Sequence, residues 1–326
     1  MKRIVLLLVI MLGCVYMAQA QSEASFSHYN MALGYYNPAS AGRSGDLDVI
    51  ALYRMQWVGW TNAPKILFAN ANMPLRFMKK EHGVGVVVSS DNASGQYKYM
   101  NAGLQYAFLK KMGKGTLRVG TQLGMMSVTA GGDNIITPDG EIDSIGGGSG
   151  GGGDEAISSS KTDAKVFDMN LGVYYATDKW YVGAAVTHLL EPEIDEDNLS
   201  TYINRGYNFI GGYNIRFKNS LFELQPSVFV QTNFNTSRAD LTAKAVYAKR
   251  YSAGLTWRMS DGQFGNDVVL LLGAVFGKIE GGYAYDIPVN KVGKGTTGSH
   301  ELFLKYRLQL NKPKTGKSKH KSVRIL

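Results

Sequence analysis

Residues 277–310 read GKIEGGYAYDIPVNKVGKGTTGSHELFLKYRLQL, and the alternation in their final third decides the fold. One face of this stretch carries Leu302, Leu304, Tyr306, Leu308 and Leu310. The other face carries Glu301, Phe303, Lys305, Arg307 and Gln309. A period of two predicts a β-strand, because successive strand residues point to opposite sides. One face suits lipid and the other suits water, and the pattern recurs along most of the chain, which is typical of a transmembrane β-barrel.

The N-terminus carries an export signal. Lys2 and Arg3 precede an apolar run at residues 4–12, and residues 18–20 form the small-residue site Ala-Gln-Ala. The run is too short to anchor the chain across a bilayer, although a short membrane helix is the alternative interpretation. We therefore predict a signal peptide at residues 1–20, cleaved after Ala20 and before Gln21.

Cys14 is the single cysteine, and Met11-Leu12-Gly13-Cys14 loosely resembles a lipoprotein acylation site. The ordinary secretion site fits better, because the hydrophobic segment continues beyond Cys14. A mature chain that starts at Gln21 has no cysteine and so no disulfide. No run after residue 20 is long and apolar enough for a membrane-spanning helix, so a closed barrel is the expected source of rigidity.

Alternating segments predict about fourteen antiparallel strands, an even number that places both chain ends on the same side of the membrane. They lie at 47–57, 63–75, 82–91, 97–109, 114–128, 165–177, 179–188, 204–217, 221–235, 238–248, 250–259, 266–277, 278–287 and 298–310. We interpret residues 47–310 as an outer-membrane β-barrel.

The connections between these strands alternate in length. The short ones, most of which carry Lys or Arg, are 76–81, 110–113, 177–179, 218–220, 249–250 and 277–278. The others, which include every long one, are 58–62, 92–96, 129–164, 189–203, 235–238, 260–265 and 288–297. This order predicts short periplasmic turns and long extracellular loops. A soluble β-sandwich is the remaining alternative, but it has no reason to sort its loops in this way.

Three segments stand apart from the wall. Residues 21–46 are predicted to be a periplasmic N-terminal segment, which either plugs the periplasmic mouth of the barrel or docks on a partner. Residues 129–164 include GGGSGGGG and predict a flexible, Gly-rich extracellular loop. Residues 311–326 form a basic periplasmic tail, for which acidic lipid, an acidic protein partner and a merely solubilising role all remain open.

The sequence nominates no catalytic, cofactor-binding or metal-binding residue. The glycine run lacks the Gly-Lys-Ser/Thr that a phosphate-binding loop needs. Acidic residues cluster at 189–203 without the spacing of a calcium loop, and the histidines lack zinc-site spacing. A His–carboxylate–Ser group assembled across strands remains open. Nucleic acid is not an expected partner, because the basic tail lacks aromatic platforms.

Several pieces of sequence resemble the PorP/SprF family of Bacteroidetes in order and spacing. The pieces are FSHYNM at 26–31, YNPASAG at 36–42, LYRMQWVG at 52–59, APK at 63–65, QPS at 225–227, residues 247–254, LTWR at 255–258, GYAYD at 282–286 and GSHE at 298–301. The resemblance covers nearly all of 25–310. The Gly-rich insertion and the basic tail depart from it.

This resemblance implies a non-enzymatic outer-membrane protein of the type IX secretion system. Such a protein supports export or surface attachment of proteins with a C-terminal sorting domain, among them adhesins and gliding-motility proteins. The implied partners are the type IX translocon or its periplasmic components, a cargo sorting domain and outer-membrane lipid. The alternative is a passive or ligand-carrying outer-membrane channel.

Overall fold

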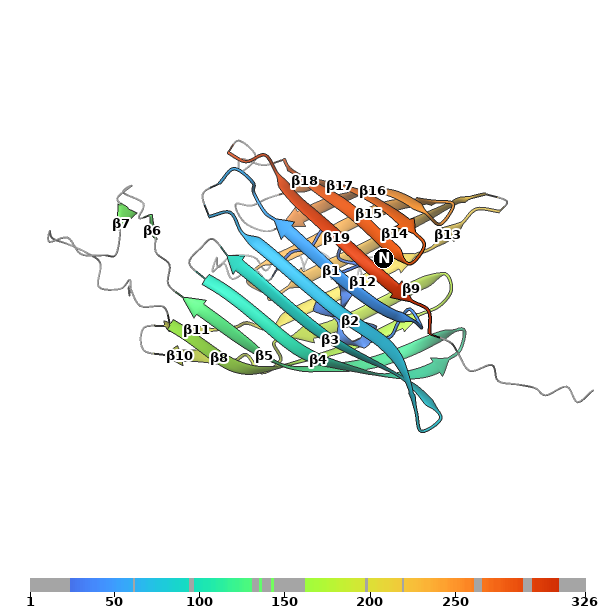
Figure 1. Ribbon diagram of the computed structural model, residues 1–326, viewed down its shortest axis with the longest axis horizontal. Helices are drawn as coiled ribbons and strands as arrows, with labels where there is room; N and C mark the ends of the chain where they lie inside the picture. The colour runs from blue at the N-terminus through green and yellow to red at the C-terminus, as the bar shows by residue number, and fades with distance from the viewer. Residues whose placement is uncertain are drawn as a thin grey trace, which may run out of the picture.

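The computed structural model describes residues 24–60, 62–93, 97–130, 135–136, 142–143, 162–196, 199–218, 220–260, 266–289 and 295–310. They form a closed antiparallel β-barrel of 14 wall strands, one of which is divided into β12 and β13 (Figure 1). The wall consists of β1 (Leu47–Met55), β2 (Lys65–Phe77), β3 (Lys80–Ala93), β4 (Tyr97–Met112), β5 (Gly115–Ala130), β8 (Thr162–Ala176), β9 (Trp180–Thr187), β12 (Gly206–Tyr213), β13 (Ile215–Arg216), β14 (Phe222–Thr232), β15 (Ser237–Tyr247), β16 (Tyr251–Ser260), β17 (Asp267–Phe276), β18 (Ile279–Pro288) and β19 (Ser299–Leu308).

The barrel closes where its first and last strands pair. β1 runs antiparallel to β19, from Leu47 opposite Leu308 to Met55 opposite His300. β12 and β13 both pair with β14, so they are two halves of one wall strand that is interrupted at Asn214. Two small hairpins complete the strands, β6 (Ile135–Ile136) with β7 (Ile142–Asp143) and β10 (Glu193–Glu196) with β11 (Leu199–Tyr202). The predicted fold class is confirmed, and the fourteen predicted segments match the wall strands.

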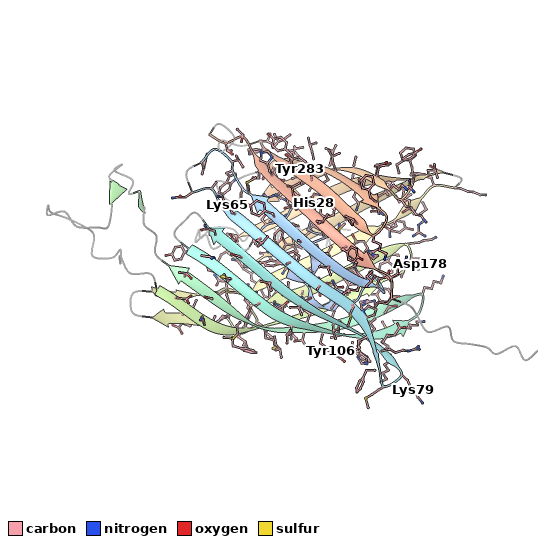
Figure 2. All side chains as sticks on the ribbon, viewed as in Figure 1. His28, Lys65, Lys79, Tyr106, Asp178 and Tyr283 are labelled. Atoms are coloured by element: carbon pink, nitrogen blue, oxygen red, sulfur yellow. The ribbon has the colours of Figure 1, made fainter. Side chains whose placement is uncertain are left out.

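The two ends of the barrel differ as the connection lengths predicted. At one end, here called the turn end, short turns such as 78–79, 113–114 and 277–278 join the strands. At the other, here called the loop end, the connections include 56–64 and 289–298. Lys79 and Asp178 lie toward the turn end and Lys65 toward the loop end (Figure 2). Which end faces the periplasm stays a prediction.

The wall has one apolar and one polar face. On β19, Leu302 and Leu304 are exposed on the outside, whereas Glu301 and Lys305 are buried inside. Exposed leucines, valines and aromatic residues recur on every long wall strand, and buried polar side chains such as Gln105 face inward. An apolar outer surface of this extent requires lipid around it. No helix in the described ranges is both long and apolar enough to cross a membrane.

The N-terminal segment, residues 24–46, lies inside the barrel. It begins near the loop end, where Ser27 contacts Glu301, and it reaches the turn end, where Gly42 donates a hydrogen bond to Asn72. Two short turns of helix interrupt it, α2 (Leu33–Tyr36) and η1 (Pro38–Ser40). The segment thus extends through the lumen to its far half, which is deeper than a plug at the periplasmic mouth alone.

Several predictions concern residues outside the described ranges. These are the signal peptide at 1–20 with its cleavage site, Cys14, most of the Gly-rich loop at 129–164, and the basic tail at 311–326.

Candidate functional site

Six charged side chains line the inside of the wall near the loop end. They are Arg54 on β1, Arg238 and Asp240 on β15, Arg258 on β16, Asp286 on β18 and Glu301 on β19. All point inward because they occupy the buried phase of the strand alternation. None is more than 8% exposed. Three guanidinium groups therefore face three carboxylates, and their formal charges balance. We call this set the clasp.

The clasp is one continuous chain of ion pairs, in the order Arg238, Asp240, Arg258, Asp286, Arg54 and Glu301. Arg258 is central, with Nε 3.1 Å from Asp240 Oδ1 and Nη1 2.5 Å from Asp286 Oδ2. Arg54 Nη2 lies 2.8 Å from the same Asp286 oxygen, and its Nη1 lies 3.5 Å from Glu301 Oε2. Because each charge has a partner, the cost of burying it is offset.

The clasp binds the backbone of the N-terminal segment. The two oxygens of Glu301 accept hydrogen bonds from the amides of Ser27 and His28, both at 2.7 Å. Ser27 Oγ donates to Asp286 at 2.7 Å and accepts from Arg54 at 2.8 Å. Hydrogen bonds to charged groups are about twice as strong as neutral ones, so this short stretch is held firmly.

Arg238 binds residues closer to the start of the segment. Its Nη1 donates to Ser25 Oγ at 2.5 Å and its Nη2 to the carbonyl of Phe26 at 2.7 Å. His28 adds a contact between its Nδ1 and Glu301 Oε1 at 2.9 Å. Charged side chains of the wall therefore bond the backbone amides of Ser27 and His28 and the carbonyl of Phe26.

Aromatic rings pack the middle of the lumen. Tyr29 stacks on Phe229 with ring centroids 5.1 Å apart, and Phe26 lies 5.6 Å from Phe68. The Tyr36 hydroxyl accepts a hydrogen bond from the Phe26 amide at 3.0 Å and donates one to the Ala24 carbonyl at 3.1 Å. Burial raises the pKa of Tyr36 to about 12. This phenol therefore stays neutral at physiological pH.

The turn-end half of the segment is held by close approach to wall glycines. Gly83 on β3, Gly120 on β5 and Gly172 on β8 face residues 37–41. A Cβ at Gly83 would lie 2.6 Å from the Ala41 carbonyl carbon, and one at Gly120 would lie 2.5 Å from Ala39 Cα. One at Gly172 would overlap Asn37 Oδ1. We call these three residues the glycine wall, because a side chain at any of them would collide with the segment.

Asn37 fixes the segment against the glycine wall. Its Oδ1 accepts a hydrogen bond from the Ala39 amide at 2.9 Å, which begins η1. Its Nδ2 donates to the carbonyls of Val173 on β8 and Ala184 on β9, at 3.0 and 3.3 Å. Pro38 follows at the first position of the turn, where its missing N–H costs no hydrogen bond.

The described histidines pair with groups that explain them structurally. His82 contacts the hydroxyl of Tyr106 at 2.8 Å, His300 that of Tyr283 at 2.6 Å, and His188 the Asp168 carboxylate at 2.7 Å. Among the described residues no group of three or more His, Cys, Asp or Glu side chains could hold a metal ion. The loop with the acidic cluster carries the β10–β11 hairpin, where Glu191 pairs with Arg205 at 3.1 Å.

A comparison with protein-family models matches residues 18–306 to the description "Type IX secretion system membrane protein PorP/SprF". The chain belongs to the PorP/SprF family. The matched range contains the N-terminal segment and nearly the whole barrel wall, so both belong to this PorP/SprF protein as family features. The membership and the barrel fold together assign the protein to the outer membrane as a secretion component.

Several of the PorP/SprF pieces of sequence meet at the clasp. FSHYNM supplies Ser27 and His28, which the clasp binds, and four of the six clasp residues come from other pieces on four strands. LYRMQWVG supplies Arg54, LTWR supplies Arg258, GYAYD supplies Asp286 and GSHE supplies Glu301. YNPASAG is the stretch that lies on the glycine wall. The sequence alone assigned no site to these pieces, and the charges at alternate strand positions were the signal available.

The PorP/SprF chain is also similar to solved outer-membrane barrels. A deletion mutant of the TodX monoaromatic hydrocarbon channel is 10% identical, with 90% of this chain and 96% of that chain covered at a TM-score of 0.49. The Ralstonia pickettii toluene transporter TbuX is 11% identical, with 86% and 94% covered at 0.49. The Pseudomonas putida toluene transporter TodX is 10% identical, with 88% and 94% covered at 0.46. Similarity of this degree does not indicate which ligands this chain binds. A comparison with curated proteins found no match.

Proposed function

We propose that this protein is a non-enzymatic component of the type IX secretion system, which supports export or surface attachment of proteins with a C-terminal sorting domain. Adhesins and gliding-motility proteins are the expected cargo class. The observation that carries the proposal is the family match over residues 18–306, which includes both the barrel and the segment inside it. The loop end then faces the cell exterior and the turn end the periplasm.

The filled lumen supports a binding role over the alternative of a passive channel. Phe26, Tyr29 and Tyr36 are each at most 1% exposed, and the clasp bonds the backbone of residues 26–28 to the wall. We infer that residues 24–46 act as a plug. A plugged barrel offers partners its loops, its strand rims and the two faces of the plug.

Deletion of the gene tests the proposal. In the deletion strain, proteins with a sorting domain should be lost from the cell surface, and the wild-type gene should restore them. Surface proteomics of intact cells measures this loss. If every such protein remains exported and attached in a strain without paralogues, the proposed role is wrong.

Conductance of the purified protein distinguishes the secretion role from the channel. In planar bilayers the wild-type barrel should conduct little, whereas deletion of residues 24–45 should open a steady channel because the wall closes without them. Steady conductance of the wild-type protein would favour the channel.

The orientation needs a test of its own. The mature chain is predicted to lack cysteine, so single cysteines can be labelled in intact cells with a maleimide that does not cross membranes. Lys65→Cys at the loop end should be labelled, and Lys79→Cys at the turn end should not. The reverse result would invert the orientation.

A further inference from the structure

A cavity opens at the turn end, beneath the N-terminal segment, with a volume of about 390 Å³. Most of the charged side chains that line it are positive. Arg43, Lys244, Lys305 and Arg307 line it with a single carboxylate, that of Asp48. We call this cavity the turn-end pocket.

The Asp48 carboxylate already has two cationic partners. Asp48 Oδ1 lies 2.9 Å from Arg307 Nε, and its Oδ2 lies 3.3 Å from Lys305 Nζ. Within the described part of the chain, the Arg43 guanidinium donates to a neutral group, the Tyr174 hydroxyl, at 3.1 Å. Lys244 Nζ has no hydrogen bond and no ion pair within 4.0 Å among the residues that the structure describes. Behind the lining, Glu280 Oε2 lies 4.0 Å from Lys305 Nζ. Two carboxylates therefore face four cations, and the pocket keeps an excess of positive charge, in contrast to the balanced clasp.

Lipid cannot neutralise this excess. Lys244 shares the inward phase of β15 with Asp240 and Thr242, both buried inside the barrel. Lys305 shares the inward phase of β19 with Glu301 and is 7% exposed. These side chains point into the lumen, away from the headgroups that contact the outer surface. Charges in a cleft with low-dielectric walls attract an opposite charge more strongly than the same charges on an open surface.

The chain's own C-terminal residues are an unsuitable occupant. β19 ends at the turn end, and residues 311–326 follow with six Lys or Arg side chains and no Asp or Glu. They would add positive charge to this end. The turns that surround the pocket contribute more, for example Lys249 and Lys278, which are both exposed. The complementary ligand must come from another molecule and must carry several negative charges.

We propose that the turn-end pocket binds an acidic segment of a periplasmic partner protein, with Lys244 and Arg43 as the residues that contact its carboxylates. The pocket's neutral lining, which includes Asn214 and Gln225, suits the amides of a peptide backbone. The orientation in this inference rests on the proposed function; the charge selectivity does not.

A fluorescent oligoglutamate peptide serves as the probe, with the full-length protein in nanodiscs of neutral phosphatidylcholine so that both ends are accessible. Lys244→Gln combined with Arg43→Gln should raise the Kd of the peptide by about tenfold or more, because close charge pairs are lost. Among the residues that the structure describes, neither side chain forms an ion pair within 4.0 Å, so both substitutions leave the pairs of Asp48 intact. Heat-modified mobility on electrophoresis checks that the barrel is intact.

Lys249→Gln combined with Lys278→Gln is the matched control. It removes the same charge from the same end, but from the rim, where salt screens the interaction within about 10 Å. The control should change Kd less than about threefold. An equal loss in both double variants, or no loss in the pocket variant, would overturn the proposal.

Two competitors distinguish other anions. Inorganic phosphate and phosphatidylglycerol vesicles should displace the peptide poorly compared with unlabelled oligoglutamate. Displacement by phosphatidylglycerol at comparable charge concentration would make this a headgroup site and overturn the proposal.

The binding test and the tests of the proposed function can fail separately. If peptide binding holds while Lys79→Cys is labelled from outside intact cells, the pocket stands and the orientation fails. If the peptide does not bind while gene deletion removes surface proteins, the pocket proposal fails and the proposed function stands.

Discussion

At residues 25–28 the N-terminal segment is held by charged side chains of the wall. At residues 37–41 it packs directly against wall glycines, which have no side chain. The clasp uses three arginines and three carboxylates on β1, β15, β16, β18 and β19. The glycine wall uses three glycines on β3, β5 and β8, nearly opposite in the strand order. The two regions hold neighbouring parts of one segment against different sides of one lumen.

The difference has physical consequences. The clasp has little tolerance for losing a charge, because the remaining partners stay buried and unpaired. The glycine wall contains no charge and depends on shape alone, so it should tolerate changes in pH and salt but no added volume. The clasp thus defines the chemistry of residues 25–28, and the glycine wall defines how closely residues 37–41 approach the barrel.

Loss of the central guanidinium should have the largest effect. In Arg258→Met, Asp240 and Asp286 each lose an ion pair while both remain buried. We expect a loss of about 3–5 kcal/mol in the free energy of unfolding, as for other broken buried pairs. Urea unfolding in detergent measures the loss, and planar-bilayer conductance shows whether the segment leaves the lumen.

Arg216→Met is the matched control. Arg216 pairs with Glu223 at 3.6 Å, but its side chain is 64% exposed. Exposed pairs contribute about 0–1 kcal/mol, so this variant should behave like the wild type. Equal effects of the two substitutions would mean that the clasp contributes no more than a surface ion pair.

Added volume at the glycine wall should have the next largest effect. In Gly120→Ala, the new methyl group meets the backbone of Ala39, which cannot rotate away. We expect a cost of about 1–3 kcal/mol, typical of overpacking, and protease cleavage within residues 37–41 should increase. Gly281→Ala is the control, because its Cβ would lie 3.7 Å from the nearest atom, the Phe303 carbonyl oxygen. Similar sensitivity of both variants would contradict the close-approach argument.

A polar substitution beside the glycine wall separates shape from charge. Asn37→Ala loses two donated hydrogen bonds and one accepted bond, at a cost of about 1–3 kcal/mol. Asn37→Asp keeps the shape but places a carboxylate against the carbonyls of Val173 and Ala184. It should be the more destabilising of the two in urea unfolding at neutral pH. A milder Asn37→Asp would show that shape alone matters there.

The sequence predicted the wall well and the site poorly, for one physical reason. Alternation is local, so the inward phase of Asp286 and Glu301 could be read from their own strands. The pairing of Arg54 with Glu301 depends on closure between β1 and β19, which no local pattern encodes. Gly120 looked like an ordinary strand glycine, because its reason lies on a segment far away in the sequence. The prediction of the barrel strands and of the family is confirmed, whereas the clasp required the three-dimensional register.

The smallest effect belongs to Tyr36, which lies between the two regions. Its pKa is raised by burial from 10.0 to about 12, so its neutral hydroxyl stabilises the fold at pH below 10, and this contribution is lost as pH rises through about 12. In Tyr36→Phe the bonds to Phe26 and Ala24 are lost at all pH values, at about 1 kcal/mol. The difference in unfolding midpoint between wild type and variant should therefore be constant up to pH 10 and shrink toward pH 12. A difference that does not change over this range would mean that Tyr36 ionises as readily in the fold as in the unfolded chain.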